Sequence, residues 1–357
     1  MVSLIVINGV LIGITIFLLI AERFLVAAGE CELSINKDTI FEVKPGKSVL
    51  SYLAEKKIFI PSGCGGKGTC GFCKIKMISG AGPVLPTEEV FLTRTDRDSG
   101  MRLACQVKVR QDIELVIPEH LLGAQEFQAT VADRYDLTED TKYLLMELNE
   151  PSEIQFRPGQ FIQINVPGSD EFRAYSIASP PSSRHIVELI VRQVPGGLCS
   201  TFIHDIMEVG DRLTFTGPFG DFYLREDSHR DIVAIGGGCG MAPIRSILMH
   251  LEEKGMPRKF SYFFGARQKK DLFYTEELRK IETEFHNFKY IPALSEPKTS
   301  DNWNGETGMI THVVEKYVVS GENVEAYLCG PPPMIDAAVE VLKKKGVKEI
   351  YIYYDKF

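Results

Sequence analysis

Four cysteines have the type and spacing that metal chemistry requires. Cys64, Cys70 and Cys73 follow the pattern C-x5-C-x2-C, and Cys105 comes after 31 further residues. Four thiolates grouped three plus one match the ligands of a plant-type [2Fe–2S] cluster, in which the first gap is one residue shorter. Glycines surround the first three cysteines, which lets the backbone approach sulfur closely and direct N–H groups at it. We predict that these four cysteines ligate a [2Fe–2S] cluster.

Other uses of these cysteines fit the sequence less well. Structural zinc usually takes two closely spaced cysteine pairs, whereas Cys105 has no cysteine nearby. Disulfides are rare inside the cell, and a thioredoxin-like C-x-x-C leaves two of the four cysteines without a role. No histidine lies between Cys64 and Cys105, which excludes a Rieske centre. The remaining cysteines are expected to be buried thiols: Cys31, Cys199, Cys239 and Cys329.

A second group of residues, in the middle of the chain, could bind a phosphate-bearing cofactor. Arg173-Ala174-Tyr175-Ser176 forms a short motif. Residues 195–201 read Pro-Gly-Gly-Leu-Cys-Ser-Thr and open a pattern that predicts a helix over residues 200–209. Glycines ahead of a helix N-terminus make an anion site suited to a pyrophosphate, and Arg173 could add a charge-assisted hydrogen bond. Taken alone, R-x-Y-S is a weak signal, because Arg173 could form a surface ion pair and Tyr175 could fill a barrel.

The last third of the chain contains two glycine turns that follow apolar runs. Residues 231–235 lead into Gly236-Gly237-Gly238-Cys239-Gly240-Met241 and then into a helical pattern. This strand–turn–helix order is typical of a dinucleotide-binding sheet, although Met241 stands where G-x-G-x-x-G would have its third glycine. A later apolar run ends at Cys329-Gly330-Pro331. The alternative for the first turn is tight packing of a strand against a helix.

Three blocks of elements must position these groups. Residues 30–120 begin with a hairpin signal and a helix that Ser48 could cap. Residues 121–226 contain short β runs at close spacing, which predicts a small antiparallel barrel. Residues 227–357 alternate strands with helices, which predicts parallel pairing in a doubly wound sheet. Their net charges are +1, −8 and −1, so the acidity of the chain lies in the middle block.

The N-terminal segment predicts a membrane anchor. Residues 1–21 carry no charged side chain, and as a helix they would span about 31 Å, enough for a hydrocarbon core of about 30 Å. A secretory signal peptide is the alternative, but no Lys or Arg precedes the apolar run. Arg23 gives weak support for a cytoplasmic C-terminal side.

Composition narrows the classes of protein further. The chain has 357 residues, of which 44% are hydrophobic and 25% charged, so it is a folded protein of two to three domains. A net charge of −8 argues against a nucleic-acid partner. Eight cysteines are too few for a disulfide scaffold of this length, and a mean hydropathy of −0.03 excludes a polytopic membrane protein.

In their order along the chain, R-A-Y-S, G-G-G-C-G-M-A-P and C-G-P-P-P-M resemble the ferredoxin–NADP⁺ reductase superfamily. With the anchor and the cysteine motif, nearly the whole chain resembles the family of F subunits of sodium-translocating NADH:quinone reductases. The resemblance implies a transmembrane anchor over 1–25, an α+β, β-grasp ferredoxin domain over 26–122, an antiparallel FAD barrel over 123–227 and an α/β doubly wound NADH domain over 228–357. One departure is that only residues 168–172 separate the run FIQINVP from R-A-Y-S, where that family carries a sizeable insertion.

The resemblance also assigns roles to single residues. The resemblance implies that Arg173 and Ala174 bind FAD, Arg173 through a phosphate. It also implies that Tyr175 packs on the isoalloxazine ring of FAD and that Ser176 forms a hydrogen bond near the reactive nitrogen of that ring. The FAD pyrophosphate is expected at Gly197, Ser200 and Thr201. The NADH pyrophosphate is expected at Gly237, Gly238 and Met241, and the nicotinamide beside Cys329, Gly330 and Pro331. Phe357 is similar to the aromatic residue that shields the flavin face, the alternative being a frayed terminus. Ser176, Cys329 and Phe357 would be the catalytic residues.

The function implied is an NADH:quinone oxidoreductase at the bacterial inner membrane, with its soluble domains facing the cytoplasm. NADH would transfer a hydride to FAD, and single electrons would pass to the cluster and through partner membrane subunits toward quinone, with sodium pumping. One alternative is an anchored reductase that supplies an oxygenase or another acceptor; a different class is a redox sensor. NADH is favoured over NADPH, although Arg267, Lys269 and Lys270 could hold a 2′-phosphate.

Overall fold

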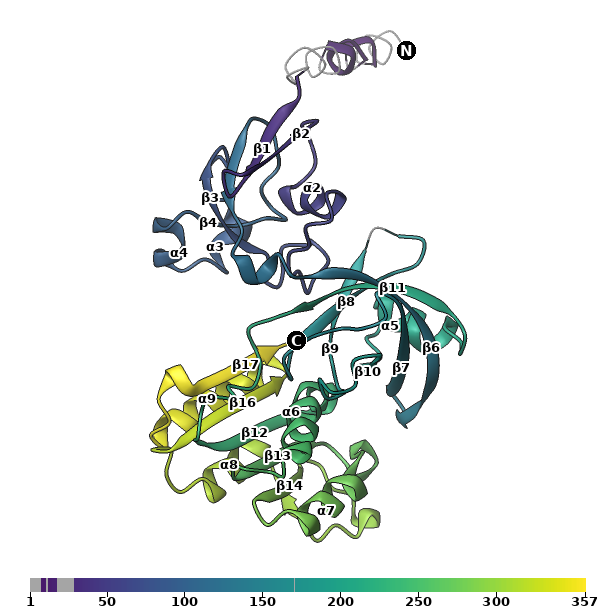
Figure 1. Ribbon diagram of the computed structural model, residues 1–357, viewed down its shortest axis with the longest axis vertical. Helices are drawn as coiled ribbons and strands as arrows, with labels where there is room; N and C mark the ends of the chain where they lie inside the picture. Colours follow the sequence, from purple (N-terminus) through teal and green to yellow (C-terminus); the bar gives the residue numbers. More distant parts are fainter. Residues whose placement is uncertain (1–7, 11, 18–28, 170) are drawn as a thin grey trace. The chain divides into compact units, whose positions relative to one another are not determined.

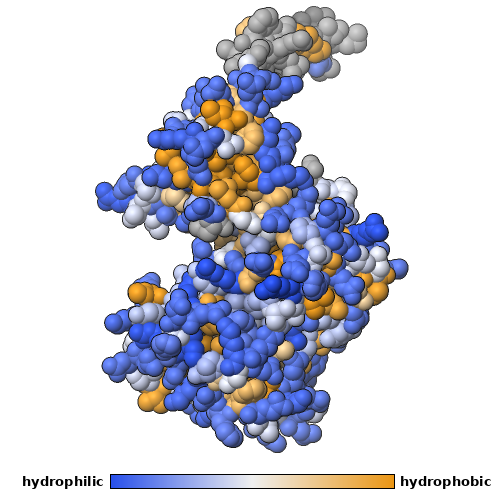
Figure 2. Space-filling view, in the orientation of Figure 1, coloured by the Kyte–Doolittle hydropathy of each residue, from blue (hydrophilic) through white to orange (hydrophobic). Residues whose placement is uncertain are grey.

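The computed structural model describes residues 8–10, 12–17, 29–169 and 171–357, which form two compact units, residues 1–122 and residues 123–357 (Figure 1). Each unit is considered by itself. Residues 8–10 and 12–17 are helical, and most of the predicted anchor over 1–25 lies outside the described residues. Among the described residues, no helix has the length and apolar character needed to cross a bilayer. Apolar side chains of this segment are exposed (Figure 2): Val10, Ile12, Ile14, Ile16 and Phe17.

The first unit is a mixed five-stranded sheet with helices, as the α+β prediction requires. The strands have the order β2-β1-β5-β3-β4, in which β1 and β5 are parallel and the other neighbours antiparallel. They are β1 (Cys31–Ile35), β2 (Thr39–Val43), β3 (Lys74–Ser79), β4 (Met101–Leu103) and β5 (Ile113–Val116), with helices α2 (Val49–Glu55), α3 (Pro86–Glu89) and α4 (Arg94–Asp98). The Ser48 hydroxyl accepts a hydrogen bond from the Ser51 N–H, which confirms Ser48 as the N-cap of α2. Leu33, Leu53 and Ile75 are fully buried in its core.

The second unit begins with an antiparallel barrel. Its strands are β6 (Gln125–Thr138), β7 (Thr141–Glu150), β8 (Phe161–Asn165), β9 (Phe172–Ser176), β10 (Ile186–Arg192) and β11 (Arg212–Phe219), in the order β10-β7-β6-β11-β8-β9. A bridge between Ile177 and Leu189 joins the end of β9 to β10, so the two edges of the sheet meet. Phe127 and Phe215 stack inside, with ring centroids 5.1 Å apart. A closed, filled barrel is what the close spacing of short β runs predicted.

The same unit ends in a parallel sheet of order β15-β14-β13-β12-β16-β17. Its strands are β12 (Asp231–Gly237), β13 (Phe260–Ala266), β14 (Phe288–Leu294), β15 (Glu306–Thr307), β16 (Val324–Gly330) and β17 (Ile352–Lys356), with helices α6 (Met241–Glu253), α7 (Thr275–Glu284), α8 (Ile310–Tyr317) and α9 (Pro332–Lys344). Alternate residues of β12 enter two different cores: Ile232 and Ala234 pack with α6 and α7, whereas Val233 and Ile235 pack with α8 and α9. Helices therefore cover both faces, which confirms the doubly wound arrangement.

Candidate functional site

The four cysteines of the predicted cluster lie together in the first unit as two pairs. The sulfurs of Cys64 and Cys70 are 3.5 Å apart. Cys73, just before β3, shares a side-chain hydrogen bond with Cys105, just after β4. The Ala104 N–H donates to the Cys73 carbonyl over 2.8 Å, which brings the end of β4 to the motif. The chain thus closes a gap of 31 residues to complete the set.

This pairing fits a cluster of two irons. Two thiolates on one tetrahedral metal, with metal–sulfur bonds of about 2.3 Å, stand about 3.7 Å apart, close to the 3.5 Å between Cys64 and Cys70. Within the described part of the chain, no three Cys, His, Asp or Glu side chains are grouped for a single metal ion. Two pairs of thiols, each able to take one iron, are what a [2Fe–2S] cluster needs.

Each pair already favours one thiolate. A hydrogen bond from Cys70 lowers the pKa of Cys64 to about 4, and one from Cys73 lowers the pKa of Cys105 to about 7. The same bonds, together with burial, raise the pKa of Cys70 and of Cys73. Since metals bind thiolates, the first proton of each pair is easily lost and the metal must displace the second.

The loop that carries the first three cysteines depends on glycine. Gly65, Gly66, Gly68 and Gly71 all have positive φ, between 64° and 82°. At Gly68 the φ of 73° disfavours any other residue, and an added Cβ would lie 2.6 Å from the Gln106 amide nitrogen and displace that side chain. The Ser62 hydroxyl accepts from the Gly66 N–H over 3.0 Å and fixes the turn.

A buried ion pair that sequence reasoning missed supports Cys105. Arg102 on β4 and Glu88 on α3 have side chains only 5% and 0% exposed, and their closest atoms are 2.6 Å apart. Arg102 also donates to the carbonyls of Ala81, Gly82 and Pro83. Burial opposes ionisation of Glu88, but hydrogen bonds from Arg102 and the backbone hold the pKa of Glu88 below its usual value. The pair anchors β4 three residues before the fourth cysteine.

In the second unit, Arg173, Ala174, Tyr175 and Ser176 lie on β9. Tyr175 is largely shielded, and burial together with a hydrogen bond to Cys199 raises its pKa. The Arg173 guanidinium donates to the Glu171 carboxylate over 2.5 Å, so the surface ion pair considered as an alternative is formed. A phosphate at Arg173 would have to compete with that carboxylate.

Ser200 and Thr201 lie in a one-turn helix after β10, α5 (Leu198–Thr201), and Gly197 is its N-cap. The predicted longer helix is only partly present, because Phe202–Ile206 widens into a π-helix and the chain is extended at Met207. The Ser200 hydroxyl accepts from the Val194 N–H over 3.1 Å. A Cβ on Gly197 would lie 2.6 Å from that hydroxyl, so the turn needs glycine there.

In the α/β part, Gly237 and Gly238 follow the apolar run of β12, and α6 begins at Met241. The Met241 side chain is fully buried and accepts a hydrogen bond from the Tyr262 hydroxyl, so only its backbone is available to a ligand at the turn. Gly240 belongs to the glycine turn seen in the sequence, but sequence reasoning gave it no role. A Cβ there would lie 2.1 Å from the Cys329 carbonyl oxygen, so the turn and β16 can pass each other only at a glycine.

Cys329, Gly330 and Pro331 are at the carboxyl end of β16, where Gly236 of β12 pairs with Cys329. Burial, and then the neighbouring Asp355, raise the pKa of Cys329. Asp355 of β17, which sequence reasoning missed, pairs in register with Cys329, and burial raises its pKa to about 6. The ends of parallel strands are where doubly wound sheets bind ligands.

Phe357 stands at the same edge of the sheet. Its side chain is 54% exposed, while its N–H donates to the Gly330 carbonyl over 3.4 Å. The residue is therefore tied to the turn after β16 and presents its ring to solvent.

Polar contacts connect the barrel to α6. Arg245 of α6 donates to the Glu188 carboxylate of β10 over 2.5 Å and to the Ala178 carbonyl over 3.2 Å. The Ser246 hydroxyl donates to the Ser179 carbonyl over 2.7 Å. Residues 178 and 179 directly follow β9, so the R-A-Y-S strand and the glycine turn before α6 are held in one unit.

Three family models match the chain. The 2Fe-2S iron-sulfur cluster binding domain matches residues 34–110, the oxidoreductase FAD-binding domain residues 128–223, and the oxidoreductase NAD-binding domain residues 234–340. The predicted cofactors, FAD, NADH and a [2Fe–2S] cluster, are thereby confirmed.

Relatives extend the similarity to nearly the whole chain. The F subunit of the Na(+)-translocating NADH-quinone reductase of Idiomarina loihiensis is 36% identical, covering 98% of this chain and 96% of the relative. That of Haemophilus ducreyi is 35% identical, covering 99% and 98%. The chain belongs to this family of F subunits. It is an NADH oxidoreductase, as predicted.

This chain is not aligned with its relatives without gaps. The alignment with the Idiomarina relative runs over 395 positions, more than the 357 residues of this chain, so it contains gaps on this side. Among solved structures, the cytochrome P450 reductase GcoB of Amycolatopsis matches with a TM-score of 0.76 at 31% identity, covering 92% of this chain and 98% of that one. The ferredoxin reductase in carbazole 1,9a-dioxygenase matches with a TM-score of 0.71 at 27% identity and the same coverage.

Proposed function

We propose that this chain is the electron-input component of a sodium-translocating NADH:quinone reductase. When bound, FAD accepts a hydride from NADH and releases its electrons singly, as the one-electron cluster requires. One observation carries the proposal: this chain is similar over nearly its full length to the F subunits of such reductases. The same chain contains the two thiol pairs, the R-A-Y-S strand and two glycine turns. Other membrane subunits would take the electrons onward to quinone.

The residues of this chain would bind and orient these groups. Cys64, Cys70, Cys73 and Cys105 would hold the cluster as two thiol pairs. For FAD, Arg173 and Ala174 would contact the cofactor, Arg173 through a phosphate. Tyr175 would pack on the isoalloxazine ring, and Ser176 would form a hydrogen bond near its reactive nitrogen. Gly197, Ser200 and Thr201 would hold the pyrophosphate. For NADH, the groups are Gly237, Gly238 and the backbone of Met241 at the pyrophosphate, and Cys329, Gly330 and Pro331 at the nicotinamide. Phe357 would shield the flavin and move aside for nicotinamide.

These groups would belong to separate domains, the cluster to residues 26–122, FAD to 123–227 and NADH to 228–357. Both lysines near the end of β13 are engaged: Lys270 pairs with Glu139 at 2.5 Å, and Lys269 donates to the Asp301 carbonyl over 3.1 Å. Neither is held ready for a 2′-phosphate, which supports NADH over NADPH.

Residues 1–25 would form a single-pass anchor in the bacterial inner membrane, with the remaining domains on the cytoplasmic side, where NADH is found. The absence of charge over residues 1–21 and the exposed apolar side chains between Val10 and Phe17 support this. A single helix without charge over residues 1–21 offers no ion path, so sodium transport would belong to partner subunits.

A second function is favoured by one observation. The structural match to GcoB, a cytochrome P450 reductase, covers 92% of this chain. An anchored reductase that supplies an oxygenase would need the same cofactors and no ion-pumping partner. Purification in mild detergent separates the two: co-purifying membrane subunits and sodium-dependent quinone reduction are expected for the first, and an isolated chain without quinone reduction for the second.

The redox chemistry itself is tested by anaerobic addition of NADH to the purified chain. We expect the flavin absorbance to bleach and the electron paramagnetic resonance (EPR) signal of a reduced [2Fe–2S] cluster to develop. Flavin that keeps its colour under NADH would overturn both enzyme functions, and slow turnover with an artificial acceptor would favour a redox sensor.

A further inference from the structure

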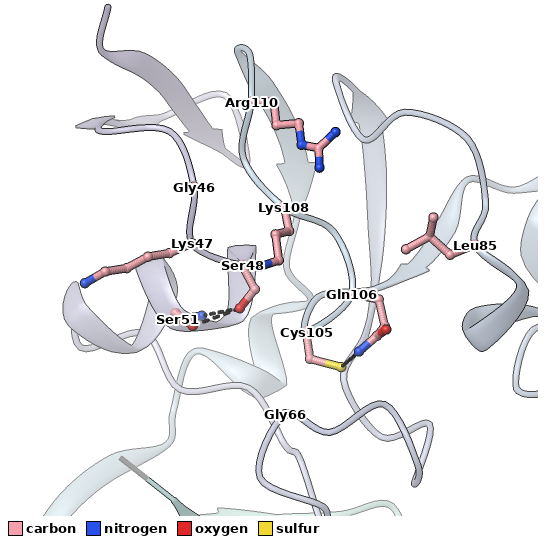
Figure 3. A pocket seen from close by; sticks show the side chains of 10 residues that line it. All are labelled: Gly46, Lys47, Ser48, Ser51, Gly66, Leu85, Cys105, Gln106, Lys108 and Arg110. Atoms are coloured by element: carbon pink, nitrogen blue, oxygen red, sulfur yellow. Dashed lines mark hydrogen bonds between the residues drawn. The ribbon is translucent and has the colours of Figure 1, made fainter. Parts of the chain in front are cut away.

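A pocket of about 610 Å³ lies beside Cys105 in the first unit (Figure 3). All of its lining comes from residues 46–110, so it belongs to this unit alone. Lys47, Lys108 and Arg110 line it, together with the hydroxyls of Ser48 and Ser51 and the Gln106 side chain. A ligand of the predicted cluster therefore borders a hollow that opens to solvent.

The backbone explains why cationic side chains reach this pocket. The segment before α2 pairs with the segment after Cys105: the Gly46 N–H donates to the Val109 carbonyl and the Val49 N–H to the Val107 carbonyl, each over 2.9 Å. Val107 and Val109 point into the core. By the two-residue alternation of extended chain, Lys108 and Arg110 must then point outward.

The charge of the lining has one sign. Lys47, Lys108 and Arg110 are cationic, and no Asp or Glu is among the lining residues. Lys47 is paired with Glu55 at 2.6 Å. Among the residues that the structure describes, neither Lys108 nor Arg110 has a side-chain hydrogen bond or an ion pair. Residues 30–120 as a whole carry a net charge of only +1, whereas the pocket lining has cations and no carboxylate.

The pocket also offers a short route to the cluster ligand. The Gln106 side chain donates to the Cys105 sulfur over 3.4 Å, and its amide oxygen accepts from the Thr87 hydroxyl over 3.0 Å. Gln106 is thus fixed between the sulfur and the pocket. A group bound in the pocket would lie next to the sulfur of a predicted cluster ligand.

We propose that this pocket is the electron-exit site, where an acceptor protein docks through acidic side chains that pair with Lys108 and Arg110. The inference rests on the proposed function, in which the cluster passes electrons to another protein. One electron leaves the reduced cluster and one acceptor centre gains it; no bond and no proton changes place. Acidic groups are the chemistry that two cations, Lys108 and Arg110, unpaired within the described part of the chain, select in a lining without a carboxylate.

The first experiment measures binding rather than turnover. The full chain is reduced with dithionite, and microwave power saturation of the cluster EPR signal is followed with hexacyanochromate(III), an inert paramagnetic anion, or with hexaamminechromium(III), its cationic counterpart. We expect only the anion to speed relaxation in the wild type, and its affinity to fall about tenfold in Lys108→Glu and in Arg110→Glu. Lys76→Glu makes the same charge change in this unit at an exposed residue outside the pocket, and should leave the affinity unchanged.

Two results would overturn the proposal. One is an equal response to both complexes in the wild type. The other is a loss of affinity in Lys76→Glu as large as that in Lys108→Glu, because the effect would then be one of net charge.

A competition experiment separates a protein-docking site from a simple anion site. A ten-residue glutamate peptide should displace hexacyanochromate at a concentration at least tenfold below that of inorganic phosphate, because linked carboxylates bind several cations at once. Equal potency of the two competitors would identify a simple anion site and contradict protein docking. NADH-dependent bleaching of the flavin should be the same in all variants. Its failure in the wild type would overturn the proposed function, while the dithionite-based measurement would still decide the pocket.

Discussion

Cys64 and Cys70 share a proton across 3.5 Å, and Cys73 and Cys105 form a second such pair. The type and spacing of these residues were enough to predict the set from sequence, because few functions require a three-plus-one group of thiols among glycines. Asp355 shows the opposite case. An aspartate near the end of a chain is unremarkable in sequence, and only the parallel pairing of β17 with β16 places it beside Cys329, where it is partly buried.

Replacing Cys70 tests the cluster assignment. In Cys70→Ser one thiol pair loses a ligand, so we expect the EPR signal of the cluster to be lost while NADH still bleaches the flavin. Cys31→Ser, which removes a buried thiol of the same unit that belongs to neither pair, should keep the signal. Loss of flavin reduction in Cys70→Ser would contradict independent binding of the two groups.

Asp355 predicts a pH-dependent stability. Burial raises its pKa from 3.8 to about 6, so folding takes up a proton between these values and the folded state loses stability as pH rises through this range. Asp355→Asn removes this penalty. Its gain in free energy of unfolding should therefore grow by about 1 kcal/mol from pH 5 to pH 7 and then level off. Denaturant unfolding followed by flavin fluorescence measures the free energy of unfolding at each pH. The control Asp227→Asn, at an exposed residue, should show no such trend. A difference between Asp355→Asn and the wild type that does not change with pH would contradict the raised pKa of Asp355.

At the scale of elements, most of the fold follows from hydrophobic periodicity. In the parallel sheet, β12 is apolar from Ile232 to Ile235 and β16 is apolar apart from Glu325, as expected where helices cover both faces. The helix after Gly197 was predicted too long, because the apolar pattern of residues 200–209 continues where the backbone has already widened into a π-helix and become extended. The pair Arg102–Glu88 could not be predicted, since no local pattern marks two charged residues 14 positions apart as partners in a core.

That pair should be essential for the element that carries Cys105. Glu88→Ala leaves the Arg102 charge buried without its partner, and we expect a loss of about 3–5 kcal/mol of stability with early loss of the cluster on heating. The visible circular dichroism of the cluster, followed during denaturant unfolding and during heating, measures the loss of stability and the temperature at which the cluster is lost. Glu55→Ala breaks the exposed pair with Lys47 and should lose less than about 1 kcal/mol. The double replacement Glu88→Leu with Arg102→Met should recover much of the stability; equal losses in the single and double variants would argue against an uncompensated charge.

Gly240 lies so close to the Cys329 carbonyl of β16 that a larger residue there should disturb the end of this strand. In Gly240→Ala the added Cβ would meet the Cys329 carbonyl, so the end of β16 must shift and NADH binding should weaken by tenfold or more. A titration of flavin bleaching with NADH measures the change. A Cβ at Gly123 meets nothing within 4 Å, so Gly123→Ala should behave as the wild type.

At the scale of the whole molecule, the order of the three motifs predicted the family better than any motif alone. R-x-Y-S and an imperfect glycine turn are weak separately, but their sequence of appearance after a cysteine motif is specific. What sequence could not predict is how the barrel and the parallel sheet are joined, because Arg245 and Glu188 lie 57 residues apart in different folds. Their ion pair is 12% and 16% exposed and fixes α6 against β10.

The Arg245–Glu188 ion pair predicts that a variant with a weakened contact between α6 and β10 still binds its cofactors but transfers hydride from NADH to the flavin more slowly. Arg245 meets Glu188 and the Ala178 carbonyl through one nitrogen and Glu277 through another, at 3.4 Å. Arg245→Lys keeps the charge but has a single nitrogen on a shorter side chain, so we expect flavin reduction by NADH to slow by about tenfold with flavin and iron content unchanged. Stopped-flow flavin absorbance measures the rate. Arg279→Lys, in an exposed helix pair, is the control. An unchanged rate in Arg245→Lys would show that other contacts set the geometry.

The closeness of the thiol pairs bears on how the chain must be handled before it matures. With sulfurs 3.5 Å apart and the pKa of one thiol near 4, an apoprotein in air holds a thiolate beside a thiol, which is the arrangement that oxidation converts to a disulfide. Such a bond would withdraw two ligands at once. The metal site must therefore be assembled before oxygen oxidises the thiols. A chain that has lost its iron and formed this disulfide must be reduced before it can bind iron again.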